Sequence, residues 1–215
     1  MKFSLLSAAC VLTACSIASA HIEEFDVEVA DWFVTGAALA PGGASTVLFD
    51  GAGEVLTASG VLGPITPESD AAIVQLILEG HIHGEIEEGM AFRVDYNFNP
   101  DFAAGSLDIL GGQLSVEALT DDGDGSLFGL GSLPTGSALF GSFETTALEL
   151  VGGPIIANHS ATEADFVLAI NFGWSGVTPA DLLSLAGTVT VTPVPAPATG
   201  ATLLAGCFAA ARRRR

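Results

Sequence analysis

Histidines alternate with carboxylates between Glu79 and Glu87, and this stretch is the clearest arrangement for chemistry in the sequence. In a β-strand every second side chain lies on the same face, so His81, His83 and Glu87 would share one face in steps of roughly 6.6 Å. Two imidazoles and a carboxylate are suitable ligands for zinc, iron or manganese. The favoured interpretation is a solvated strand face on which histidines pair with acids of neighbouring strands. The alternative is a transition-metal site formed by His81, His83 and Glu87.

The spacing of these three residues also resembles half of the metal-binding motif of the cupins. The resemblance implies a metal-dependent enzyme in which a third ligand converges on the metal inside a concave barrel. Gln75 and Val94 stand where the cupin motif has glycines, and His159 lacks the glycine and proline residues that frame the family's second motif.

A second candidate site is the acidic segment DDGDGS, which contains Asp121, Asp122 and Asp124. Closely spaced carboxylates on a glycine-containing turn supply the hard oxygen ligands that Ca²⁺ prefers. An EF-type loop would need glycine in place of Leu127 and an acidic residue in place of Leu133. The segment is therefore interpreted either as a polar hairpin turn or as a low-coordination calcium site completed by a neighbouring loop. The calcium site would suit a Ca²⁺-dependent carbohydrate-binding module.

The elements that position these residues are predicted to be strands, because apolar and polar residues alternate through most of the chain. One buried face and one solvated face are typical of antiparallel sheets, and the glycines between the strands mark turns. We expect an all-β fold, a single antiparallel β-sandwich of jelly-roll or immunoglobulin-like type. The clearest buried faces are Phe25, Val27 and Val29; Leu76, Leu78, Ile82 and Ile86; Met90, Phe92, Val94, Tyr96 and Phe98; and Phe166, Leu168, Ile170, Phe172 and Trp174.

One short helix is expected within this β-rich chain, between Thr178 and Gly187. Thr178 would cap it, Pro179 suits its first turn, and Asp181 would lie near its positive end.

Charge is distributed unevenly along the 215 residues, which carry 25 Asp and Glu against six Lys and Arg. Five of the six cations lie at the two ends, so residues 21–192 hold 25 acids and Arg93, a formal charge of 1 − 25 = −24. This balance excludes nucleic acid as a partner, and the absence of lysine from this segment excludes Schiff-base and P-loop chemistry there. Arg93 is expected to pair with Asp95 on the same strand face.

Residues 1–20 are typical of a secretory signal peptide, with Lys2 before an apolar stretch and a small-residue cleavage pattern ending at Ala20. An alternative is a lipobox ending at Cys15, which would then carry the lipid. The three cysteines lie in the two ends of the chain, so residues 21–192 have neither a disulfide nor a thiolate metal site.

Residues 193–215 combine a proline-rich spacer, an apolar segment and a terminal arginine cluster. At about 1.5 Å per residue, a helix over residues 198–211 would be roughly 21 Å long, which is shorter than a hydrocarbon core. The segment resembles the PEP-CTERM sorting signal, with Ala196 replacing the glutamate of the family's Val-Pro-Glu-Pro motif. The residues that carry the resemblance are Val194, Pro195, Ala196, Pro197, Arg212, Arg213, Arg214 and Arg215.

This resemblance implies export through the secretory translocon, transient anchoring in the inner membrane and recognition by an exosortase-type protease. A simple C-terminal membrane anchor is the alternative. Together, the segments 1–20, 21–192 and 193–215 predict an exported, non-catalytic cell-surface or extracellular-matrix protein, with exported polysaccharide as an expected partner. The metal-dependent enzyme and the Ca²⁺-dependent carbohydrate-binding module are the alternative functions.

Overall fold

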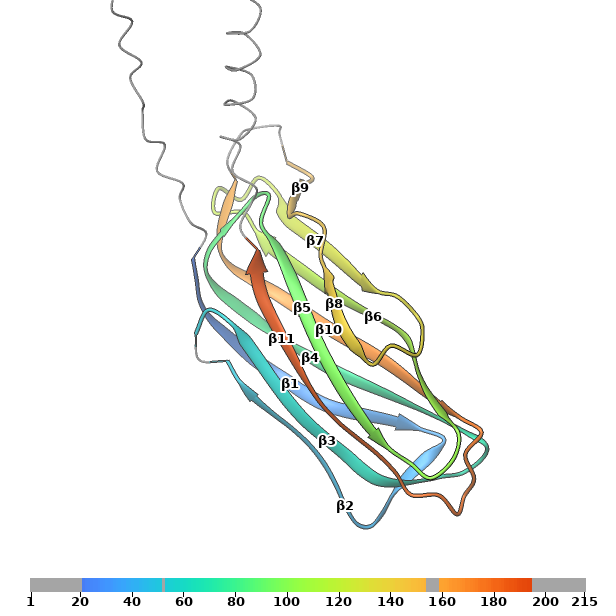
Figure 1. Cartoon of the computed structure of the whole chain (residues 1–215). Coiled ribbons are helices and arrows are strands. Elements are labelled where there is room, and N and C mark those ends of the chain that lie inside the picture. The colour runs from blue at the N-terminus through green and yellow to red at the C-terminus, as the bar shows by residue number, and fades with distance from the viewer. Residues whose placement is uncertain (1–20, 52, 154–158, 195–215) are drawn as a thin grey trace, which may run out of the picture.

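The computed structural model describes residues 21–51, 53–153 and 159–194, which form eleven β-strands in two antiparallel sheets (Figure 1). Sheet A has the order β1-β4-β10-β6-β7-β9, and sheet B has the order β2-β3-β11-β5-β8. The strands are β1 (Ile22–Thr35), β2 (Ala37–Asp50), β3 (Leu56–Pro67), β4 (Ala71–Glu87), β5 (Ala91–Asp101), β6 (Ser106–Leu119), β7 (Ser126–Leu133), β8 (Phe140–Glu144), β9 (Glu149–Val151), β10 (Ser160–Ser175) and β11 (Leu183–Val194).

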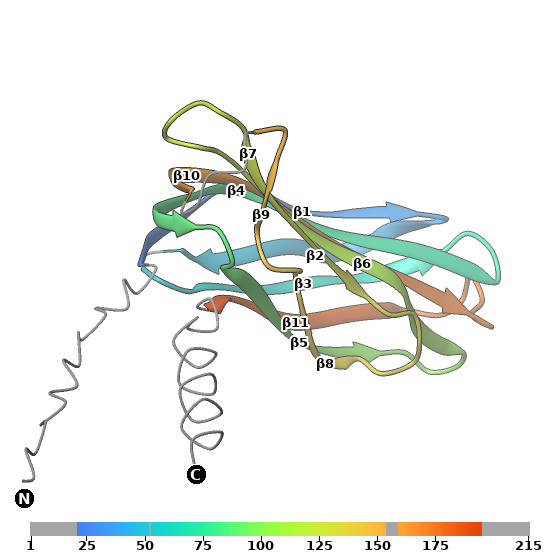
Figure 2. The same ribbon diagram turned by 90° about the horizontal axis from the view of Figure 1, so that it is seen from above.

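The two sheets lie as layers with one hydrophobic core between them (Figure 2). Aromatic rings join the layers. The ring of Phe98 on β5 packs edge-on against that of Phe172 on β10, with centroids 4.7 Å apart, and Phe25 on β1 contacts Phe92 on β5 in the same way. The expected antiparallel β-sandwich is therefore confirmed.

In most of the strands, the apolar face that the sequence predicted to be buried lies in the core. The side chains predicted to be buried on β4, β5 and β10 all lie in the core. The exception is Val29 on β1, because a register shift between Val27 and Val29 reverses the alternation there. Val29 lies opposite Glu79, while Ala30 and Trp32 continue the inward face.

The expected short helix is wrong. The backbone N–H of Asp181 donates to the carbonyl of Thr178, and the Asp181 carboxylate accepts from the N–H of Thr178, so this segment closes a turn. The Thr-Pro and Asp signals that start helices also suit tight turns. Leu183 and Leu185 then follow with strand alternation, both fully buried, and β11 pairs with β3 and β5. No helix among the described residues is long and apolar enough to span a membrane.

The described fold begins and ends at the same end of the sandwich (Figure 1). Ile22 on β1 pairs with Gly84, and Val194 on β11 pairs with Ala91, so both ends lie beside the turn that joins β4 to β5. The last strand runs two residues beyond the expected boundary at residue 192. The expected signal peptide at 1–20 lies outside the described residues, as do Pro195, Ala196, Pro197 and the four arginines of the tail.

Two glycines lie directly opposite each other in sheet B, at a point where large aromatic rings fill the core. Gly60 on β3 pairs with Gly187 on β11. A Cβ atom on Gly60 would come within 3.2 Å of the Trp32 ring, and one on Gly187 would overlap the Phe98 ring. The Trp32 indole N–H donates to the carbonyl of Thr46 at 3.3 Å. The glycine pair therefore allows both rings to pack close to the backbone of sheet B.

Candidate functional site

His81 is held among three carboxylates on the outer face of sheet A. Its Nδ1 lies 2.8 Å from Oδ1 of Asp165 and 3.6 Å from Oε1 of Glu163, both on β10. Its Nε2 lies 3.4 Å from Oε1 of Glu28 on β1. We call these four residues the His81 cluster. Because β4 runs between β1 and β10, the imidazole links three neighbouring strands.

Glu28 reaches His81 because of the irregularity in β1. Asp26 pairs with His81 and Val27 with Gly80, but the next paired residue is Val29, so Glu28 is the extra residue of a β-bulge. A Cβ on Gly80 would collide with the backbone of Asp26 and would lie 2.9 Å from Cα of Val27. Glycine is therefore required at position 80, because the backbone of the bulged strand β1 lies too close to β4 for a side chain there. Glu28 was not predicted from the sequence, although an isolated glycine inside a strand is a signal for a bulge.

The carboxylates favour the charged form of the imidazole. The hydrogen bond to Asp165 raises the pKa of His81 from its ordinary value, desolvation of the ring opposes this effect, and Glu28 adds a second hydrogen bond that raises the pKa. The His81 cluster is thus an ion-paired arrangement whose charge balance depends on pH.

The other members of the predicted metal ladder lie nearby, without forming a preassembled metal centre. The His83 ring lies 6.3 Å from that of His81, and Glu87 closes β4 opposite Ser160. No group of three or more His, Cys, Asp or Glu residues among those the structure describes is arranged to hold a metal ion. His81 and His83 also lie on the outer face of an open sheet, whereas a cupin site requires the inside of a barrel. A metal role for His81, His83 and Glu87 stays a prediction.

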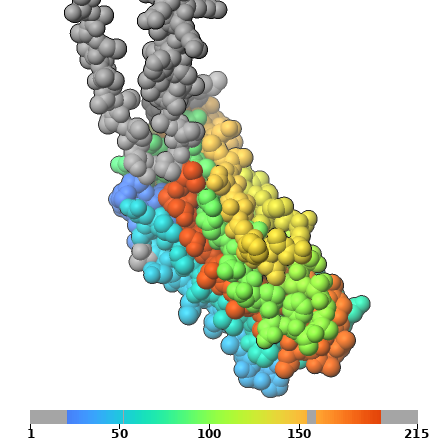
Figure 3. All heavy atoms as spheres, in the orientation of Figure 1, coloured from blue at the N-terminus to red at the C-terminus, as the bar shows by residue number. Residues whose placement is uncertain are grey.

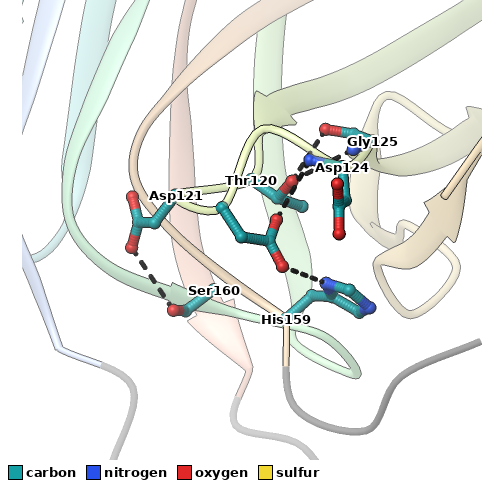
Figure 4. A network of polar contacts seen from close by, with 7 residues as sticks. Thr120, Asp121, Asp124, Gly125, His159 and Ser160 are labelled. Carbon is teal, nitrogen blue, oxygen red and sulfur yellow. Dashed lines mark hydrogen bonds and ion pairs between the residues drawn. The ribbon is translucent and has the colours of Figure 1, made fainter. Parts of the chain in front are cut away.

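The predicted calcium segment forms the β6–β7 turn, and the carboxylates of Asp121 and Asp122 contact different partners. The Ser160 hydroxyl donates to Asp121 at 3.3 Å (Figure 4), and the Thr162 hydroxyl donates to the same carboxylate at 3.5 Å. The Oδ1 of Asp122 accepts from the backbone N–H of Asp124 at 3.2 Å. The Thr120 hydroxyl and this N–H lower the pKa of Asp122. These contacts are those of a polar hairpin turn that is fastened to β10 by Asp121.

His159 is a buried residue beside this turn (Figure 4). Its Nδ1 lies 3.3 Å from Oδ2 of Asp122, which is an ion-pair distance. Neither ring nitrogen has a hydrogen bond within the part of the chain that the structure describes. From the sequence, His159 was considered only as a cupin ligand without the glycine and proline residues of that motif, and its burial beside the turn was not predicted.

A groove on the outer face of sheet B was not predicted. It is an open groove of about 390 Å³ over β3, β11 and β5, with one lining residue from β2. Its polar lining comes from Thr46, Ser59, Asn97, Asn99 and Thr188, and the Gly60–Gly187 pair lies at its floor. None of the nine described residues that line it carries a charge. No single segment contains this set, because strand pairing brings together residues far apart in the sequence.

No protein-family model matches the chain, and no curated protein matches it. Among solved structures, it is similar to a carbohydrate-binding module of the β-sandwich superfamily, with 10% identity and a TM-score of 0.24 over 72% of this chain and 53% of that one. It is also similar to the family 11 carbohydrate-binding module from Clostridium thermocellum, with 12% identity and a TM-score of 0.23 over 81% of this chain and 97% of that one. A pore-forming protein gives 11% identity and a TM-score of 0.26 over 68% and 77%. The chain thus spans about half the length of the first of these structures, and likeness at these TM-scores assigns neither a family nor a ligand.

Proposed function

We propose that this chain is an exported, non-catalytic β-sandwich that is displayed at the cell surface or in the extracellular matrix and acts by binding. Residues 1–20 direct it through the secretory translocon. Residues 193–215 anchor it transiently in the inner membrane, where an exosortase-type protease recognises the variant motif at Val194–Pro197. Exported polysaccharide is its partner.

The observation that carries the proposal is that the described strands occupy the segment between the two expected sorting signals. Described secondary structure begins at Ile22, two residues after the expected cleavage point, and ends at Val194, the first residue of the sorting motif. The described strands therefore span the expected body, residues 21–192, and β11 extends two residues into the expected tail, so that Val194 is both its last residue and the first residue of the motif.

The position of the two ends supports display. Because β1 begins and β11 ends at one end of the sandwich, a tail held at the membrane leaves the opposite end facing away from it (Figure 1). The Gly36 turn between β1 and β2 and the Thr178 turn before β11 lie at that opposite end. The lysine-free, strongly acidic body also suits an exported protein, because like charges keep such a protein soluble and monomeric.

The test is to express the full chain in a bacterium that has an exosortase-type protease. It is compared with a truncation that stops after Val194, which leaves β11 complete, and with a variant in which the four terminal arginines are replaced by serine. We expect the full chain at the cell surface, where added protease degrades it in intact cells. We expect the truncation in the periplasm or medium.

A strain without the exosortase-type protease is the control, and we expect it to retain the full chain in the inner membrane. Two results would overturn the proposal: full chain that stays in the cytoplasm, or full-length and truncated chains with the same distribution in both strains.

A further inference from the structure

We propose that the groove on sheet B binds a neutral polysaccharide chain, which is laid across the strands in contact with Ser59, Asn97 and Thr188. This inference deepens the proposed function by naming its binding site and ligand class. Figure 3 views the molecule from this side, where β11 forms a narrow strip between β3 and β5.

The groove presents hydrogen-bonding groups that the protein itself does not use. Hydroxyls and amides donate and accept at once, as sugar hydroxyls do. The side chains of Ser59, Asn97, Asn99 and Thr188 have no hydrogen bond to any other described residue. A volume of about 390 Å³ lies in the range of roughly 300–1,000 Å³ that small-molecule sites occupy.

The register of sheet B gives the ligand its direction. Leu48, Ser59, Thr188, Asn97 and Phe140 lie in one row across the five strands, because each pairs with the next. Four steps of about 4.8 Å between strands make the row roughly 19 Å long. The row therefore accommodates an extended chain of several sugar rings.

Exposed apolar side chains stand at both ends of the polar row. Phe140 on β8 is 74% exposed and Leu48 on β2 is 70% exposed. An aromatic ring has an electron-rich face and attracts the electropositive C–H groups on the flat side of a sugar. Polar groups in the middle with apolar contacts at the ends match a ligand that has both hydroxyls and C–H faces.

Charge argues for a neutral chain. Arg93, the one cation between residues 21 and 192, donates to Asp95 from Nε at 3.0 Å and from Nη2 at 2.8 Å, which confirms their expected pairing. No free cation is therefore left in this segment to neutralise a carboxylate or sulfate group. The 25 acids of the same segment repel anionic polysaccharides.

The test is affinity electrophoresis of the full chain through native gels that contain dextran, laminarin or hydroxyethyl cellulose, with alginate as the anionic comparison. We expect at least one of the three neutral polymers to retard the chain and alginate to leave it unretarded. The variants Asn97→Ala, Thr188→Val and Phe140→Ala each change an exposed side chain. Each should weaken the retardation by about five-fold to ten-fold. Asn171→Ala is the matched control, because it removes the same amide from the second hollow, on the outer face of sheet A, and should leave the retardation unchanged.

Three results would overturn the inference: no retardation by any of the three neutral polymers, retardation by alginate of equal strength, or retardation that the groove variants leave unchanged. None of these results depends on sorting. A chain that reaches the surface but binds no neutral polymer would refute the binding proposed for the groove and leave the sorting intact. A chain that binds a neutral polymer in gels but does not reach the surface would refute only the proposed sorting.

Discussion

The carboxylate of Asp165 on β10 lies 2.8 Å from Nδ1 of His81 on β4, and Glu28 approaches the other ring nitrogen from β1. One imidazole thus joins the three strands at one edge of sheet A. When this imidazole is protonated, its contacts with the carboxylates are attractive ion pairs.

The first prediction concerns the pH dependence of stability. Because the folded pKa of His81 is raised, its ion pairs stabilise the fold fully below the unfolded value of about 6.5, and this stabilisation is lost as pH rises through the folded value. Melting curves between pH 5 and pH 9 should show that His81→Gln lowers Tm at the acidic end and has little effect at the alkaline end.

His83→Gln is the matched control, since His83 has no ion pair to any residue in the described ranges and its change should have a smaller effect at acidic pH. A difference in Tm between wild type and His81→Gln that is equal at pH 5 and pH 9 would contradict the assignment of the proton to these contacts.

The second prediction concerns salt. Residues 21–192 carry a formal charge of −24, and salt shortens the range of repulsion between their carboxylates to about 8 Å at physiological strength. Tm should rise by roughly 5 °C between 10 mM and 500 mM NaCl, with a further rise in Mg²⁺ or Ca²⁺ at equal ionic strength. Melting curves that coincide at the two salt concentrations would show that self-repulsion does not limit stability.

The third prediction uses the two opposed glycines as a matched pair. Gly187→Ala forces a methyl group into the Phe98 ring, whereas Gly60→Ala places it 3.2 Å from the edge of Trp32. Gly187→Ala should lower the free energy of unfolding by about 1–3 kcal/mol, and Gly60→Ala should lower it by less. Denaturation in urea measures both values. Equal losses, or a larger loss for Gly60→Ala, would mean that the rings do not pack as described.

The fourth prediction concerns metal removal. Asp121 accepts from Ser160 and Thr162, while Asp122 accepts from the Asp124 backbone and faces His159, so the three carboxylates do not converge. EDTA should leave Tm unchanged, and elemental analysis of the purified chain should find less than one equivalent of calcium or transition metal. A Tm that falls in EDTA and recovers with Ca²⁺ would restore the calcium interpretation, whereas recovery with Zn²⁺ would restore the His81–His83–Glu87 interpretation.

Much of the fold could be predicted because antiparallel strands with one wet face show period-two alternation directly in the sequence. Phe92 and Trp174 illustrate this, since each belongs to an unbroken alternating run and each lies in the core. Leu183 illustrates the failure. Cap-like residues before it predicted a helix, but turns use the same residue types, and the pairing of β11 with β3 and β5 decided the conformation.

The sites were harder to predict than the strands. The sequence placed His81 and His83 on one face of a strand, and the structure agrees. Glu28 reaches His81 through a bulge that shifts the register by one residue, which alternation alone does not reveal. The groove could not be predicted for a different reason. Ser59, Asn97 and Thr188 lie on three different strands and come together only through strand pairing.

The packing of Trp32 under the Gly60–Gly187 pair gives the protein an internal optical reporter. Its indole N–H bonds to the carbonyl of Thr46, a residue of the groove, and the backbone of Gly60 separates the ring from the outer face. The chain has two tryptophans, and Trp174 lies elsewhere in the core, so a Trp174→Phe variant leaves a single fluorophore. We therefore expect the proposed binding of polysaccharide in the groove to change the intrinsic emission of this ring, without any attached dye.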